Sequence, residues 1–202
     1  TLYHGAAIAA DAPPLRLAWE KDILTIHGEH LPGKEVRIRY LEAYCRPGST
    51  DRDWAETTIG HKTRLVSADK DGRKLALACK LNDGAEVNHE IAVVDDSVTF
   101  NVVAHNPTDK ASDAHWAQPC IAVDKFTGRT QQDYVPQCFV LLDGKVTRLP
   151  TQPWATKARY IPGQVYCPKH VDRNDVNPRP LSDLVPSHGL IGCFSPDARW
   201  IL

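Results

Sequence analysis

The sequence has no run of like charge and no long apolar run. Its 24 lysine and arginine residues nearly balance its 25 aspartate and glutamate residues, for a formal net charge of -1. The charges are interspersed, so the chain lacks the basic footprint that marks nucleic-acid-binding proteins. No apolar stretch approaches the roughly 20 residues that a helix needs to cross a bilayer. We therefore expect no nucleic-acid partner and no membrane span.

Motifs that mark several common active sites are also missing. The sequence has no Gly-rich phosphate loop and no βαβ unit to carry one, which argues against nucleotide binding. It has no G-x-S-x-G turn of the hydrolase type. Nine histidines are present, but none are arranged as H-x-H or H-E-x-x-H. We predict no metal site and no cofactor, with a transition-metal or calcium site as less favoured alternatives.

The six cysteines form no C-x-x-C pair, which argues against a zinc ribbon. Six cysteines leave many disulfide connectivities open. Cys79, however, continues the alternation of Leu75 and Leu77 on what we interpret as an inward strand face. A buried free cysteine behaves as a small hydrophobe. We expect Cys79 to be a reduced core thiol and most of the others to be core thiols as well, with room for one bridge.

No segment shows a helical period over three turns. Apolar and polar residues instead alternate with a period of two, as in 35–45, where Val36, Ile38 and Tyr40 share one face. Turn signals recur at intervals of roughly 10 residues, which is typical of an antiparallel sandwich or barrel. The sequence therefore predicts an all-β fold, an antiparallel β-sandwich, with strand content well above helix content.

The length of 202 residues suits one domain, which we assign to residues 15–202. Residues 1–14 are rich in alanine, and we interpret them as a leader remnant or a flexible N-terminal segment. Prolines interrupt nearly every pattern in residues 150–202, so we expect long loops and short edge strands there. The sequence stops in the strand-like stretch 199–202. We expect these last residues to pair in the sheet, the natural chain to continue, and the sandwich to lack its C-terminal strands.

The stretch 96–128 holds the densest polar and aromatic cluster of the chain. A predicted strand ends there at an Asn-Pro turn, followed by the cluster 115–120, HWAQPC, and a short predicted strand at 121–123. The side chains that we predict to project into one concavity are His105, His115, Trp116 and Gln118. An aromatic face stacks on the apolar side of a pyranose, and a histidine acts as acid or base near neutral pH. The alternative is a structural histidine beside a core tryptophan.

Two arginines of the Pro-rich region are candidates for the rim of this concavity. Arg159 and Arg179 lie in or beside long loops. Arginine binds a carboxylate, such as that of a uronic acid, through two parallel hydrogen bonds. Taken singly, each is more often a surface residue or a residue that braces a loop. We predict that one of them closes the rim beside His115.

A strand, a turn and a histidine-aromatic pair follow one another in the middle of the chain. The residues concerned are Phe100–Ala104, Asn106–Thr108, His115, Trp116 and Gln118. This combination, within residues 73–150, resembles the galactose mutarotase-like family. The resemblance implies an antiparallel supersandwich. It also implies that His115 is a general acid, because the matched histidine has that role in the family. The family's base is a glutamate near the C-terminus, and its counterpart would lie past Leu202.

The whole chain also resembles an uncharacterised family of exported bacterial proteins, through residues 40–54, 115–120 and 175–182. This second resemblance implies a secreted or periplasmic location. The function that we predict is a carbohydrate-active or carbohydrate-binding domain, with a site of the epimerase, lyase or hydrolase type if it is an enzyme. The alternative is a non-catalytic structural or protein-interaction sandwich. A fold alone does not decide between these classes.

Overall fold

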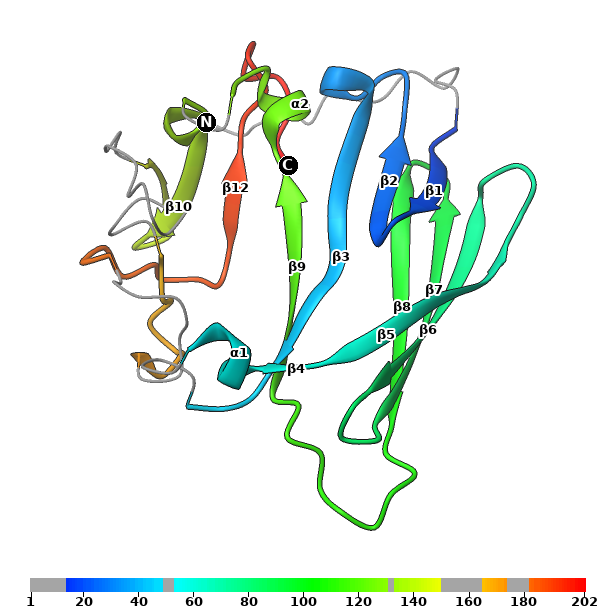
Figure 1. The fold of residues 1–202 in the computed structure, drawn as a ribbon. Coiled ribbons are helices and arrows are strands. Elements are labelled where there is room, and N and C mark those ends of the chain that lie inside the picture. The colour runs from blue at the N-terminus through cyan, green and yellow to red at the C-terminus, as the bar shows by residue number, and fades with distance from the viewer. Residues whose placement is uncertain (1–13, 49–52, 131–132, 150–164, 174–181) are drawn as a thin grey trace.

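The computed structural model describes residues 14–48, 53–130, 133–149, 165–173 and 182–202 (Figure 1). Of these residues, 49% lie in strands and 9% in helices, and the strands form three antiparallel sheets. The predicted all-β fold is thus confirmed, while the mutarotase-like arrangement stays a prediction. Residues 1–13 of the N-terminal segment that we interpreted as a leader remnant lie outside the described residues. Arg159 and Arg179 also lie outside them. No described helix is long and apolar enough to span a membrane.

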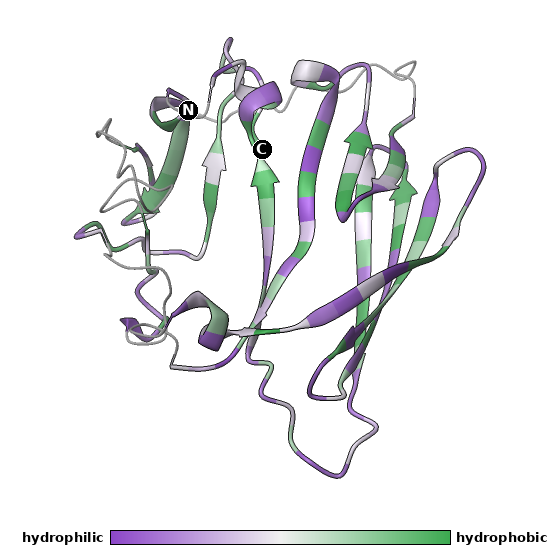
Figure 2. Ribbon diagram, in the orientation of Figure 1, coloured by the Kyte–Doolittle hydropathy of each residue, from purple (hydrophilic) through white to green (hydrophobic). Residues whose placement is uncertain are grey.

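The first sheet has five strands, in the order β1-β2-β3-β4, with β9 paired to the other edge of β3. Its strands are β1 (Arg16–Glu20), β2 (Ile23–His27), β3 (Glu35–Cys45), β4 (Thr58–Ile59) and β9 (Trp116–Ala122). Two short helical turns belong to its connections, η1 (Pro32–Lys34) and α1 (Trp54–Thr57). The alternation read from residues 35–45 corresponds to β3, and Figure 2 shows it as alternating bands of hydropathy.

The second sheet is a meander of four strands joined by tight turns. The strands are β5 (His61–Ala68), β6 (Lys74–Leu81), β7 (Glu86–Val94) and β8 (Ser97–His105). The third sheet has the order β11-β10-β12, with β10 (Cys138–Leu142), β11 (Lys145–Arg148) and β12 (Ile191–Cys193). The short helices α2 (Asp124–Thr127) and η2 (Val135–Gln137) connect β9 to β10.

The first two sheets pack face to face around the main core. Leu24 from the first sheet and Leu77 and Ile91 from the second are almost completely buried there. Burying a large aliphatic side chain stabilises the fold by about 1.5–3 kcal/mol. Cys79 lies in the same core, so its predicted buried position on the inward face is confirmed, while its reduced state stays a prediction. The described part of the chain is therefore organised as a β-sandwich with the third sheet beside it.

A second, smaller core lies between the third sheet and α2. Phe126, Val140 and Leu149 are buried in it, and Leu202 packs against both cores. The backbones of Cys193 and Leu202 exchange two hydrogen bonds, of 2.9 and 3.0 Å. The prediction that the last residues pair in the sheet is therefore confirmed.

The strand β9 begins five residues earlier than the predicted strand at 121–123 and includes Trp116–Cys120, the cluster HWAQPC without its histidine. Proline is uncommon inside strands, because it has no N–H to donate to a ladder. Residues 40–42 of β3, however, all stand opposite Pro119, because Arg39 pairs with Cys120 and Ala43 with Gln118. The ladder is interrupted at such a bulge. The missing N–H of Pro119 therefore removes no expected ladder bond.

The sandwich is open along one side, where β8 and β9 are the outer strands. Among the described residues, β8 pairs only with β7, and β9 pairs only with β3. The strand partners of Phe100, Val102 and Ile121 are all buried, which places these three side chains on the inward faces. They are nevertheless 43%, 50% and 45% exposed. The inward faces of β8 and β9 are thus partly uncovered, and the candidate site lies there.

Candidate functional site

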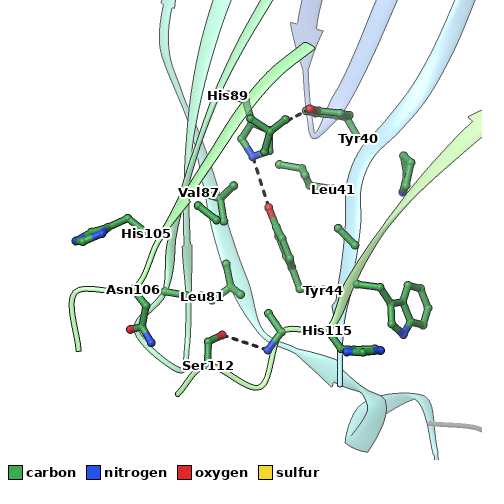
Figure 3. Close-up of a pocket in the computed structure, with 17 residues that line it drawn as sticks. Tyr40, Leu41, Tyr44, Leu81, Val87, His89, His105, Asn106, Ser112 and His115 are labelled. Atoms are coloured by element: carbon green, nitrogen blue, oxygen red, sulfur yellow. Dashed lines mark hydrogen bonds between the residues drawn. The ribbon is translucent and has the colours of Figure 1, made fainter. Parts of the chain in front are cut away.

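A cavity of about 530 Å³ lies between β8 and β9 (Figure 3). This volume falls within the range of roughly 300–1,000 Å³ that is usual for small-molecule sites. The walls are apolar and come from the first sheet, the second sheet and the turn after β6. They include Leu41, Leu81, Val87, Val102, Ala104 and Pro119. The loop that joins β8 to β9, residues 106–115, closes one end of the cavity.

Three polar side chains form the floor of the cavity. The Tyr40 hydroxyl lies 3.0 Å from Nδ1 of His89, and the Tyr44 hydroxyl lies 3.5 Å from Nε2 of the same ring. Both tyrosines come from β3 and the histidine comes from β7, so the cluster joins the two sheets (Figure 3). His89 is only 2% exposed. The floor is therefore a buried Tyr-His-Tyr cluster at the base of an apolar cavity.

Burial keeps all three groups of the floor uncharged at neutral pH. It lowers the pKa of His89, because a charged imidazolium is poorly solvated there. It raises the pKa of Tyr40 to about 12, and it is also the main reason that the pKa of Tyr44 is raised. A neutral imidazole has one N–H and one acceptor nitrogen. One tyrosine therefore donates to His89, and the other accepts from it.

A bulge in β3 lies between the two tyrosines, which share the cavity side of the strand. Leu41 has a φ of 60°, which is unusual for a bulky residue, and the register with β9 shifts around it. The Leu41 carbonyl accepts a hydrogen bond from Nε2 of His61 on β5, at 2.9 Å. The His61 ring also packs edge-on against Tyr44, with the ring centroids 5.1 Å apart. These contacts hold the distorted segment of β3 against the second sheet.

Asp83, in the turn between β6 and β7, anchors the loop that closes the cavity. Its Oδ2 accepts hydrogen bonds from Ser112 Oγ at 2.6 Å and from the Asp113 amide at 3.1 Å. Burial alone would raise the pKa of Asp83, but hydrogen bonds, the largest from Ser112, lower it overall. Gly84 has a φ of 100°, and a Cβ there would lie 2.6 Å from Cγ2 of Thr108. The turn and the loop therefore fit closely together.

Replacing Asp83 with asparagine is expected to loosen residues 106–115, because an amide nitrogen cannot accept the bonds that Oδ2 accepts. Loss of about 1 kcal/mol would make hydrogen exchange at the Asp113 amide roughly fivefold faster. The folded-state pKa of Asp83 lies below 3.8. Its contribution is therefore present above pH 3.8 and is lost as the pH falls through the folded-state value. Asp109→Asn, in the same loop, is the control. Equal exchange rates in wild type and Asp83→Asn would contradict this anchoring role.

The structure brings only some of the predicted site residues to one cavity. His105, His115 and Trp116 border it, but the rings of His105 and His115 turn away from it in Figure 3. Gln118 does not line the cavity, and its amide donates to Glu42 Oε2 at 3.0 Å. Side chains alternate along a strand, so Ala117 and Pro119 share the inward face of β9 while Trp116 and Gln118 share the other. The ligand-binding roles of these residues stay predictions.

The sequence interpretation missed the three residues of the floor. Tyr40 was placed on one face of its strand with Val36 and Ile38, but it was given no role in a site. His89 occupies an inward position between Val87 and Ile91, where an apolar residue is the usual choice. That interruption of an apolar face was the available signal. Tyr44 lies four residues after Tyr40 and so falls on the same face, but nothing in the local sequence indicates the bulge at Leu41 between them.

Among the described residues, no three His, Cys, Asp or Glu side chains lie close enough together to hold a metal ion. The polar groups at the cavity are instead hydroxyl, imidazole and amide groups. Comparison with known proteins adds no relative: no protein-family model, no curated protein and no solved structure matches the chain. The proposed function therefore depends on the geometry of the cavity.

Proposed function

We propose that the domain binds a saccharide ring in the cavity between β8 and β9. The observation that carries the proposal is the combination of apolar walls with the polar floor of Tyr40, Tyr44 and His89 in one cavity of about 530 Å³. Ligand sites in proteins commonly combine an apolar lining with a few convergent polar groups. The export of the protein and its mutarotase-like fold are parts of the same proposal and depend on the sequence resemblance alone.

A saccharide has the surface that such a cavity requires. One face of a pyranose presents C–H groups, which pack against aliphatic walls such as those of Leu81, Val87 and Val102. Its hydroxyls need hydrogen-bond partners, because a buried hydroxyl without one costs about 1–3 kcal/mol. A tyrosine hydroxyl has one O–H and two lone pairs, so Tyr40 and Tyr44 can each bond His89 and one ligand hydroxyl. The floor therefore suits the hydroxyl edge of the ring.

The cavity supports binding better than it supports catalysis. Glycosidic bond hydrolysis usually requires two carboxylates, and no described residue that lines the cavity is an aspartate or a glutamate. His115 is the candidate acid from the family resemblance, but its ring turns away from the cavity. The cavity histidine with an inward ring is His89, and it is held between two tyrosines. We therefore propose that the domain binds a saccharide without catalysing a reaction.

A protein-interaction role is the second candidate, and a separate observation favours it. Phe100, Val102 and Ile121 extend the apolar surface out of the cavity along the open side of the sandwich. A contiguous exposed apolar patch is typical of a surface that binds another macromolecule. The same surface would admit an apolar segment of a partner in place of a sugar.

Titration of the full chain with a panel of neutral and acidic saccharides tests the proposal. We expect saturable heat of binding for at least one saccharide in calorimetry. We also expect that saccharide to displace an apolar dye such as ANS from the protein. Dye binding without any response to the panel would reject the saccharide and favour the interaction role. Absence of both signals would reject the cavity as a ligand site.

A further inference from the structure

We propose that Cys138 and Cys193 are a disulfide pair that cross-links β10 to β12. Both are free thiols in the structure, and both are buried in the second core. They stand directly opposite each other in the antiparallel ladder between the two strands. This inference is independent of the proposed saccharide site, because the third sheet contributes no residue to the lining of that cavity.

The backbone hydrogen bonds around the two cysteines define the type of ladder position that they occupy. The amide of Phe194 donates to the Gln137 carbonyl. The neighbouring pair, Gln137 and Phe194, therefore occupies a hydrogen-bonded position of the ladder. The Cys138 carbonyl accepts instead from Leu149, on the β11 side. The backbone of Cys193 bonds Leu202, on the other side of β12. The two cysteines therefore form a non-hydrogen-bonded pair.

Such a pair has the spacing that a disulfide requires. Facing Cα atoms at a non-hydrogen-bonded position are about 4.5 Å apart, and their side chains lie on the same face of the sheet. Disulfide-bonded cysteines have Cα separations of about 4.4–6.8 Å. Cys138 and Cys193 can therefore be joined by side-chain rotation, without separating or sliding the strands.

The other four cysteines have no comparable arrangement. In the strand registers, Cys45 faces Trp116, Cys79 faces Thr63 and Val87, and Cys120 faces Arg39. Cys167 lies outside the strands, and its thiol contacts the carbonyls of Pro168 and Val171. Cys138 and Cys193 are thus the one pair of cysteines that the described ladders place face to face. This selects one connectivity among the many that six cysteines allow.

The cross-link forms by thiol–disulfide exchange with a small disulfide such as oxidised glutathione. The thiolate of one cysteine attacks the glutathione disulfide, and one reduced glutathione leaves. The thiolate of the second cysteine then attacks the protein sulfur of the mixed disulfide, and a second glutathione leaves. Two protein thiols are oxidised and one glutathione disulfide is reduced to two thiols. The protons of the two cysteines pass through solvent to the departing glutathione thiolates.

Burial decides when this exchange is fast. Burial and the neighbouring Cys193 raise the pKa of Cys138 to about 12, and burial raises that of Cys193 to about 11. The reactive species is the thiolate, so both cysteines react slowly in the folded state. The bond is therefore expected to form during folding in an oxidising compartment. Once formed, it would restrict the unfolded chain and raise the melting temperature.

Refolding from denaturant in a glutathione redox buffer tests the pair. With two of the six cysteines oxidised, we expect four free thiols on denaturing titration and an intact mass lower by two hydrogen atoms. Peptide mapping of the wild-type chain should recover one cross-linked peptide that contains Cys138 and Cys193. Dithiothreitol should restore all six thiols and lower the melting temperature.

The variants Cys138→Ser and Cys193→Ser should each keep all of their remaining thiols under the same conditions. The matched control, Cys167→Ser, should still lose two thiols to the cross-link. Mapping of the wild-type chain does not depend on whether any variant folds. Six free thiols in refolded wild-type protein, or a cross-link mapped to any other pair, would overturn the proposal.

Discussion

Replacing His89 with alanine is expected to lower the free energy of unfolding by about 3–5 kcal/mol. The side chain is almost completely buried, so its loss leaves a cavity beneath the apolar walls. It also removes the hydrogen-bond partner that Tyr40 and Tyr44 share. A buried hydroxyl that loses its partner costs about 1–3 kcal/mol. Urea denaturation followed by circular dichroism measures the change, provided that unfolding is two-state.

The same variant should change the dependence of stability on pH. Burial holds the folded-state pKa of His89 below its usual 6.5, so the unfolded chain binds more protons between these two values. The contribution of His89 to stability is therefore complete above pH 6.5 and falls as the pH drops through the folded-state pKa, by at most about 1.4 kcal/mol per pH unit. The difference between wild type and His89→Ala should shrink over the same interval.

Two kinds of variant separate the contribution of this cluster from general effects of losing a histidine. His105→Ala removes an outward ring from β8 and should change the free energy of unfolding by less than about 0.5 kcal/mol. Tyr40→Phe and Tyr44→Phe each remove one hydroxyl and should cost less than His89→Ala. A loss below about 1 kcal/mol for His89→Ala, or a difference from wild type that does not vary with pH, would show that the cluster does not stabilise the fold in this way.

Local patterns were sufficient to predict the main strands. The alternation in 35–45 predicted β3. Among the recurring turn signals, Asp83-Gly84 lies between β6 and β7, and Asp95-Asp96 lies between β7 and β8. Such patterns work because a strand with one buried face must alternate, and because tight turns favour particular residues. The inward position of Cys79 followed from the same alternation. These features depend on residues close together in the sequence.

The site depended on contacts that local patterns do not encode. His89 and Tyr40 are 49 residues apart, and their contact depends on which strands face each other across the sandwich. The bulge at Leu41 is supported by His61 from the other sheet. The outward direction of His105 follows from a register that puts Ala104 opposite the buried Val87. The sequence therefore located β3, β6, β7 and β8, but it missed the part of β9 that lines the cavity and the side chains of the floor.

Replacing Ala104 with tryptophan is expected to weaken ligand binding at least about 100-fold, or about 2.7 kcal/mol. Ala104 lies on the inward face of β8 and lines the cavity, opposite Val87 of β7. An indole at this position would occupy the space that a saccharide ring, or an apolar dye, would otherwise fill. Ala104 itself is exposed, and tryptophan is well tolerated in strands, so the fold should remain intact. Calorimetry with a saccharide identified by the panel, and dye fluorescence, measure the loss.

Val103→Trp is the matched control, because it adds the same ring to the preceding residue of the same strand. Val103 faces Asn88 on the outer side of the sheet and is 56% exposed. The Val103→Trp variant should therefore bind the saccharide and the dye as wild type does. Both variants should have melting temperatures close to that of wild type, which separates a blocked cavity from a damaged fold. Unchanged binding in folded Ala104→Trp would place the ligand outside the cavity. Equal losses in both variants would locate binding at the edge of β8, where both rings would interfere with a docked partner.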